Sequence, residues 1–470
     1  MAFRRRSGAV GSSSECDWIY DSGVELSLLN HASVRLHGDN LDLVTDPWFE
    51  GTAFNDGWSL VFDTPPEARE LLRHSSQIWL SHEHPDHFSP QTLLQIPPKE
   101  RADHEILYQE TRDKKVKSWC SEVGFSCREL PHNVWTYINP TTRVMLGTIP
   151  FDDSWLALQN SGVTVLNLND CVLDVEALLR IRDAIGEVNV LLSQYSYAGW
   201  LGNPENVDAR RDGASKVLSR LRTQVEILRP DFTLPFASAI YFGHSENRYL
   251  NDERNSLRNA FDALCDLPTK AICLTPGETW HLGDTHDNLK SLAIFDWAND
   301  LTNKSFVSSA PVTFSELLKA FSQYTARIKN RNNRLLLRIA TLRGIGVIPT
   351  VRLWLTDLEM WVEFNVVRGL TQLKSKPKSV DAEISSECLN FLLTKDFGID
   401  TLMVNGRLIA GTKGLTPLIR AFGIGKLNNS GRIIGFRLLL DLGYLRAIFR
   451  HPGFHSTTKR KPQQELGVRT

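Results

Sequence analysis

The segment 82–87, His-Glu-His-Pro-Asp-His, constrains this chain more than any other, because it places three imidazoles and a carboxylate in one short turn. The apolar residues 78–80 that precede it are typical of a buried strand. On extended backbone the first two histidines point to the same side, and the turn that begins at the proline directs the aspartate and the last histidine to a neighbouring point. One loop can therefore provide ligands for two cations. A histidine-rich surface loop without metal is the alternative.

Length and composition limit the classes of protein that remain. A chain of 470 residues is too long for one ordinary core and predicts two domains, the first of them large. With 53 basic and 54 acidic side chains the formal net charge is -1, which argues against a nucleic-acid or anionic-membrane partner. Seven cysteines without regular spacing favour reduced thiols in a cytoplasmic protein. The basic start of the chain has no apolar stretch behind it, so we expect a disordered tail over residues 1–20 rather than a signal peptide, and no membrane span.

The first two thirds of the chain show an α/β pattern. Short β-rich segments alternate with helical ones, for example 163–166 before a helix near 175–182, and then the apolar strand 188–192. Residues 214–229 carry apolar side chains at helical spacing and lead into a strand at 231–236. This alternation predicts a sheet-based domain covered by helices.

The segment 82–87 resembles the His-x-His-x-Asp-His signature of the metallo-β-lactamase fold, a four-layer αββα sandwich with a dinuclear site along one edge of its two sheets. Residues 28–36 and 43–48 are predicted to be two short strands of the opening hairpin. The sequence Asp46-Pro47-Trp48 resembles the first motif of that fold, in which Asp46 would hydrogen-bond the metal loop without touching the metal. The resemblance implies a catalytic αββα domain over residues 21–300.

A narrower resemblance is to the CMP-N-acetylneuraminate hydroxylase group. It rests on the segments 46–58, 165–171, 234–238 with His244 beyond it, and 275–278. Those hydroxylases receive electrons through a Rieske cluster, which needs histidines two or three residues after its cysteines. None of the seven cysteines here has a histidine at that spacing. We therefore expect no Rieske cluster, and sugar-nucleotide hydroxylation does not carry over.

The fold implied by the resemblance needs ligands beyond the loop. Asp170 occupies the place of the bridging aspartate, whose oxygens can be shared between two cations, and is the predicted catalytic residue; a helix N-cap is the alternative role. At the third motif, where hydrolases carry histidine, Asp153 is the better carboxylate and Asp152 the alternate. His244 is the predicted last ligand. The full predicted set is His82, His84, Asp153 and Asp170 for one cation, and Asp86, His87, Asp170 and His244 for the other.

A carboxylate in place of a third-motif histidine hardens the site and favours iron or manganese over zinc. The diiron oxygenases of this fold carry that replacement, and Asp153 makes the site similar to theirs. We expect a dinuclear iron enzyme that hydroxylates an organic substrate with O2, with a zinc- or manganese-dependent hydrolase of an ester, amide or phosphodiester as the alternative. Aromatic side chains are predicted to line the substrate pocket, with packing in the core as the alternative for each: Trp48, Trp58, Tyr195, Tyr197 and Trp200.

The last third of the chain predicts a separate small domain. Around 299–311 the sequence becomes rich in Asn, Thr, Ser and Pro, which indicates a boundary. Residues 312–450 predict an α+β domain that weakly resembles sterol-carrier-like modules, with a helix over 385–393 and then a turn and a strand through 397–407. A flexible tail is expected over 451–470. The expected partners are a small-molecule substrate, with a carrier- or CoA-linked one hinted at by this segment, and a separate electron-donor protein.

Overall fold

The computed structural model describes residues 23–149, 153–342, 347–429 and 431–434. The predicted tails at 1–20 and 451–470, and Asp152, lie outside the described residues. The chain divides into two compact units, Met1–Leu201 with Asn206–Val307, and Gly202–Glu205 with Ser308–Thr470.

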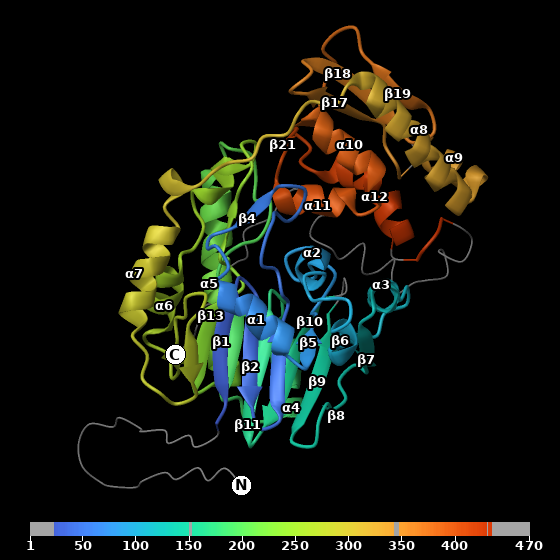
Figure 1. Cartoon of the computed structure of the whole chain (residues 1–470). Helices are drawn as coiled ribbons and strands as arrows, with labels where there is room; N and C mark the ends of the chain where they lie inside the picture. Colours follow the sequence, from blue (N-terminus) through green and yellow to red (C-terminus); the bar gives the residue numbers. More distant parts are fainter. Residues whose placement is uncertain (1–22, 150–152, 343–346, 430, 435–470) are drawn as a thin grey trace, which may run out of the picture. The chain divides into compact units, whose positions relative to one another are not determined.

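The first unit is built on two seven-stranded sheets (Figure 1). The first sheet has, in spatial order, strands β16 (Thr279–His281), β1 (Glu25–Asn30), β2 (Ser33–Gly38), β3 (Leu41–Thr45), β5 (Gln77–Trp79), β6 (Glu105–Gln109) and β7 (Ser126–Leu130). The second has β15 (Lys270–Ala271), β13 (Phe232–Phe236), β12 (Val190–Gln194), β11 (Val163–Asn169), β10 (Ser154–Asn160), β9 (Thr142–Thr148) and β8 (Thr136–Tyr137). A short pair, β4 (Trp58–Leu60) with β14 (Ile240–Phe242), stands apart from both sheets.

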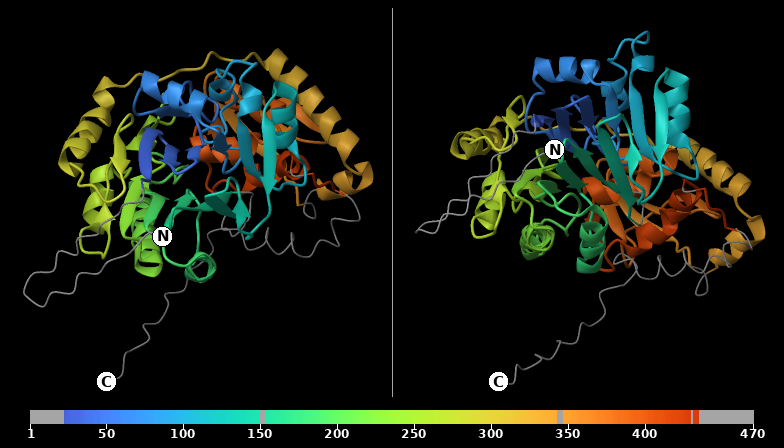
Figure 2. Two further views of the ribbon diagram at one scale, coloured as in Figure 1. Left: turned by 60° about the horizontal axis from the view of Figure 1, so that its bottom comes forward. Right: turned by 90° about the horizontal axis from the view of Figure 1, so that it is seen from below.

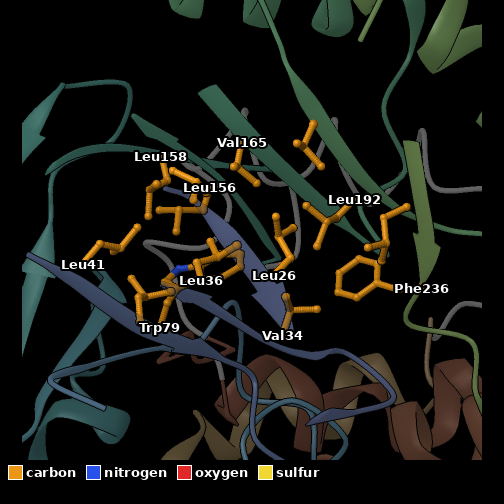
Figure 3. Close-up of a cluster of buried hydrophobic side chains, with 14 of the residues drawn as sticks. Leu26, Val34, Leu36, Leu41, Trp79, Leu156, Leu158, Val165, Leu192 and Phe236 are labelled. Carbon is orange, nitrogen blue, oxygen red and sulfur yellow. The ribbon is translucent and has the colours of Figure 1, made fainter. Parts of the chain in front are cut away.

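Apolar side chains of the two sheets meet in one core. Leu26, Val34 and Leu36 of the first sheet face Leu156 and Leu192 of the second (Figure 3). These side chains are almost fully buried, so the interface between the sheets contributes much of the hydrophobic stabilisation of the unit.

Helices cover the outer face of each sheet. The first sheet packs its other face against α1 (Pro66–His74), α2 (Pro90–Leu93) and α3 (Lys115–Val123). The second sheet packs against α4 (Val175–Ile185), α5 (Val207–Leu228), α6 (Leu257–Leu264) and α7 (Asn288–Ala298). Figure 2 shows the layers from two further sides, with blue α1 outside the first sheet and green helices outside the second. The predicted αββα sandwich is confirmed.

Two-residue turns set the register of the hairpins. Between β10 and β11, Asn160 pairs with Val163, and both turn residues, Ser161 and Gly162, have positive φ, as a tight hairpin requires. Asn30 pairs with Ser33 across an equally short turn between β1 and β2. The predicted single strand over 28–36 is therefore wrong: it is two strands, and His31 lies in the turn between them.

The second unit is a small α+β fold, as predicted. Its five-stranded sheet has the order β19 (Gly369–Gln372), β18 (Met360–Asn365), β17 (Val351–Leu355), β20 (Ala382–Ile384) and β21 (Ile409–Ala410). Its helices are α8 (Phe314–Arg331), α9 (Arg334–Ala340), α10 (Ser386–Thr394), α11 (Gly398–Asn405) and α12 (Thr416–Asn429). Across the described residues, no helix has both the length and the apolar character needed to span a membrane.

Candidate metal centre

The segment 82–87 begins three residues after β5, at the carboxyl end of that parallel strand. Its backbone turns at once, because the amides of His87 and Phe88 both donate to the carbonyl of His84, at 3.0 and 2.7 Å. His82, Asp86 and His87 are buried. The loop therefore presents imidazole and carboxylate groups away from bulk water.

Asp46 connects this loop to both sheets. Its carboxylate is fully buried and accepts hydrogen bonds from the amide and hydroxyl of Ser81 at 2.7 and 2.8 Å. It also accepts from His87 Nδ1 at 3.0 Å and from Asn169 Nδ2, at the end of β11, at 2.8 Å. One carboxylate thus holds the loop 82–87 against the second sheet by hydrogen bonds, and its role in orienting metal ligands stays a prediction.

Two further carboxylates come from neighbouring strands of the second sheet. Asp153 precedes β10 and Asp170 follows β11, and because these strands are antiparallel, the start of one and the end of the other share an edge. His82 Nε2 lies 3.8 Å from Asp153 Oδ1 and 3.9 Å from Asp170 Oδ2. The Ser154 hydroxyl donates to the carbonyl of Ser81 at 2.5 Å, which ties the start of β10 to the metal loop.

Donor atoms from these loops converge into three groups, each within a span of 4.8 Å. The groups are His82, His84 and Asp153; His82, His87 and Asp170; and His31, Asp86 and His87. Six of the seven predicted ligands are in them. Because His82 and His87 each occur in two groups, the groups form one continuous cluster rather than separate sites.

His31 is the functional candidate that sequence reasoning missed. Its Nε2 lies 3.4 Å from Asp86 Oδ2, and its ring packs edge-on against that of His87. Its φ of 29° is in the left-handed region, which a residue with a side chain rarely adopts. The turn is held on the second sheet by a hydrogen bond from the Ala237 amide to the His31 carbonyl. A strained residue held by both sheets and directed at the cluster indicates a function.

His244 joins none of the three groups found among the described residues. It follows β14, and its ring Nδ1 accepts a hydrogen bond from the Glu246 amide at 3.2 Å and lies 3.6 Å from the Glu246 carboxylate. Its role as the last ligand stays a prediction, while His31, and not His244, lies in one group with Asp86 and His87.

Burial sets the protonation of several imidazoles. It lowers the pKa of His31, His82 and His84, because the charged form loses its water. In the uncharged form an imidazole has a lone pair free for a metal ion. Three of the donors are therefore already in the state that ligation requires.

Attraction to the histidines offsets burial at the carboxylates. Burial disfavours ionised Asp86, yet His87 and His31 hold the pKa of this carboxyl well below its ordinary value. Burial likewise opposes ionisation of Asp170, and His82 and His87 lower its pKa. Burial acts against the charged form of His87, but Asp86 and Asp46 raise its pKa well above the ordinary value. A cation would replace the proton that His87 holds.

Buried polar atoms without hydrogen-bond partners also indicate that these residues could hold metal ions. Among the described side chains, the buried atoms Asp86 Oδ1, Asp170 Oδ1 and His31 Nδ1 have no hydrogen-bond partner. His82 Nε2 lies only 2.6 Å from His84 Nδ1, so two ring nitrogens face each other. Buried polar atoms without partners are costly, and a metal ion would satisfy such groups.

A small cavity adjoins the cluster. His31, Asp86, His87 and Asp170 line it, together with two of the five predicted pocket residues, Trp58 and Tyr197. The other three do not line it. Trp48 is buried with its indole donating to the Glu50 carbonyl, Tyr195 packs in the outer core of the second sheet, and Trp200 is partly exposed.

A four-layer sandwich with a His-x-His-x-Asp-His loop at the edge of its two sheets is the metallo-β-lactamase fold. In amino-acid sequence the chain is similar to the cytidine monophosphate-N-acetylneuraminic acid hydroxylase of Cricetulus griseus, with 27% identity over 277 residues, 55% of this chain and 48% of the relative. The hydroxylase of Danio rerio is 25% identical over 245 residues, 49% of this chain and 40% of the relative. The predicted resemblance is confirmed, and the chain spans about half the length of these relatives. No family model matches the chain.

Solved structures of the same fold are similar to part of this chain. CmlA, a diiron β-hydroxylase from Streptomyces venezuelae, is 12% identical with a TM-score of 0.36, over 61% of this chain and 53% of that protein. An isothiocyanate hydrolase from Delia radicum gut bacteria is 14% identical with a TM-score of 0.40, over 55% of this chain and 98% of that protein.

Proposed function

We propose that this protein is a non-haem diiron oxygenase that hydroxylates an organic substrate with O2. The observation that carries the proposal is the position of Asp153, which lies with His82 and His84 where a zinc hydrolase of this fold would place a third histidine. Carboxylate oxygen is a harder donor than imidazole nitrogen and favours iron or manganese over zinc.

The donor set divides between two cations. His82, His84, Asp153 and Asp170 would hold one, and Asp86, His87, Asp170 and His31 the other, with Asp170 shared between them. Three carboxylates in a buried site offset much of the charge that two such ions bring. When bound, the iron pair supplies the redox chemistry that O2 activation needs, which no amino-acid side chain can provide.

The chain's own residues position and protect the reaction. Asp46 orients His87 by accepting from its Nδ1, so that Nε2 faces the cluster. Trp58 and Tyr197 in the cavity wall exclude water, which would otherwise quench an oxidising site. The overall reaction balances as R–H + O2 + 2e⁻ + 2H⁺ → R–OH + H2O.

The two electrons come, in this proposal, from a separate electron-donor protein. The substrate is a small molecule of natural-product, lipid-like or sugar-derived character, and a carrier- or CoA-linked form fits the proposed sterol-carrier-like character of the second unit. The similarity to hydroxylases over 277 residues supports the reaction class and leaves the substrate open.

Metal analysis tests the proposal directly. Protein expressed in iron-supplemented medium is expected to contain about two iron ions per chain and to show the charge-transfer absorption of ferric iron. His84→Ala and Asp170→Ala should each remove most of the metal from a folded protein, whereas His74→Ala, at an exposed position on α1, should not. Stoichiometric zinc without iron uptake, together with hydrolysis of an ester, amide or phosphodiester, would establish the hydrolase instead.

A further inference from the structure

Arg254 is a partly buried cation without an anion. Its Nη1 donates to Asn251 Oδ1 at 3.1 Å and its Nη2 approaches Asn299 Oδ1 at 3.5 Å, while its Nε is buried without an acceptor. In the part of the chain that the structure describes, no ion pair of Arg254 with a carboxylate is found. The nearby Arg210 shows the usual arrangement, with two hydrogen bonds of 2.7 Å to Asp252.

Arg254 is one of the residues that line the cavity beside the candidate metal cluster. Asp86, His87 and Asp170 line the same cavity. Asp86 and Asp170 line this cavity, but among the described residues neither forms an ion pair with Arg254. Once metal ions take up those carboxylates, Arg254 adds a further positive charge to a site that already attracts anions.

The backbone at Arg254 is fixed by its neighbour. The Asn255 amide donates to Ser196 Oγ at 3.1 Å, and its side-chain amide donates to the carbonyls of Tyr195 and Ala214 at 2.9 and 2.8 Å. The Tyr197 hydroxyl donates to the Leu250 carbonyl on the same segment. These hydrogen bonds attach the loop that carries Arg254 to the cavity wall. The side chain is therefore positioned before a ligand binds.

A buried and unpaired charge costs stability, and a guanidinium stays charged in proteins. Burial lowers the pKa of Arg254, since the cation has lost water without gaining an anion. This loss of stability is offset when a bound ligand provides an anion that pairs with the guanidinium.

We propose that Arg254 binds a carboxylate of the substrate, and so selects anionic substrates and orients them toward the metal centre. The free Nε–H and a neighbouring Nη–H form the planar fork that a carboxylate matches. This inference rests on the metal centre of the proposed function, but it holds for an oxygenase and for a hydrolase.

Acetate is the probe for this site. Metal-loaded full-length protein is titrated with acetate, phosphate or neutral acetamide, and binding is followed by the shift in thermal midpoint and in the metal absorption spectrum. Arg254→Gln is expected to weaken acetate binding by about tenfold or more, the value of one charge-assisted pair. Arg254→Lys should keep part of the affinity, because the cation remains.

Arg258→Gln is the matched control, an exposed arginine four residues away that pairs with Asp296. Acetate also binds metal ions, so variants are compared at equal metal content, which separates loss of Arg254 from failure of the metal site. Equal acetate affinity in Arg254→Gln and the unaltered protein overturns the proposal, as does absence of acetate binding in both. Tighter binding of phosphate than of acetate, dependent on Arg254, overturns the carboxylate assignment.

Discussion

The Asp46 carboxylate accepts a 3.0 Å hydrogen bond from His87 Nδ1, and this contact determines which ring nitrogen of His87 faces the metal cluster. With Nδ1 carrying the proton that Asp46 accepts, Nε2 is directed at Asp86 and Asp170, at 3.2 and 3.8 Å. The same carboxylate accepts from Ser81 and Asn169, so it positions the metal loop and the second sheet together.

Asp46→Asn should therefore weaken metal binding without unfolding the protein. An amide presents a donor where His87, Ser81 and Asn169 all need an acceptor, so the loop loses its orientation while the surrounding core persists. We expect a loss of about 10- to 100-fold in metal affinity, measured by competition with a chelator. Asp42→Asn is the control, because Asp42 lies at the other end of the same strand, β3, and pairs with Arg35. Unchanged affinity in Asp46→Asn would show that His87 is not oriented through Asp46.

The second metal position distinguishes two histidines. His31→Ala should reduce the metal content from about two ions per chain to about one, because Asp86 and His87 then lack a neighbouring imidazole donor. His244→Ala should leave the metal content unchanged, since His244 contacts Glu246 rather than the cluster. Metal analysis of both variants, with circular dichroism as a check on folding, decides between them; the reverse result would give His244 its predicted role.

Most of the site could be predicted from the sequence, because local spacing carries its chemistry. The loop at 82–87 fixes its own ligands by alternation and a turn. Asp153 and Asp170 are predicted from the resemblance to the metallo-β-lactamase fold, and the structure brings them to 3.8 and 3.9 Å from His82. His31 could not be identified in this way, because residues 28–36 are predicted to form one strand. A histidine inside a strand gives no sign that it belongs to a metal site. The turn signal was the Asn-His-Ala sequence itself, which lacks the glycine that usually marks such turns.

Packing decided the features that local patterns left open. The strand predicted after α10 is instead helix α11, whose Ile399 and Leu402 are both buried, three residues apart, and which ends at Gly406 with a φ of 65°. A short apolar segment such as this one can form a strand or a helix. Packing against the rest of the second unit determines that it forms a helix. Likewise, composition alone does not tell which aromatic side chains line the cavity and which pack in the core.

Metal preference can be tested by restoring the histidine that zinc hydrolases carry. Asp153→His would place a third imidazole with His82 and His84, and the softer donor set should raise the ratio of zinc to iron bound from a medium that contains both. Elemental analysis of the purified variant measures this ratio. Asp113→His, a substitution on a partly exposed loop, is the control and should bind as the unaltered protein does. An unchanged ratio in Asp153→His would remove Asp153 from the first metal position.

Stability at the far edge of the first sheet should depend on pH through Glu129. Burial opposes its ionisation, but hydrogen bonds from Lys114 and Lys117, at 2.9 and 3.0 Å, outweigh it and lower the pKa of Glu129 below its ordinary value of 4.5. A lowered pKa means that the stabilisation is present above the unfolded value and is lost as the pH falls through the folded one. Glu129→Gln should therefore lower the free energy of unfolding by about 0.5 to 1 kcal/mol at neutral pH, and the difference should shrink below about pH 4.5. Urea titrations of the metal-free protein at both pH values measure it, with the exposed Glu110→Gln as control; a difference that grows in acid would contradict the pairing.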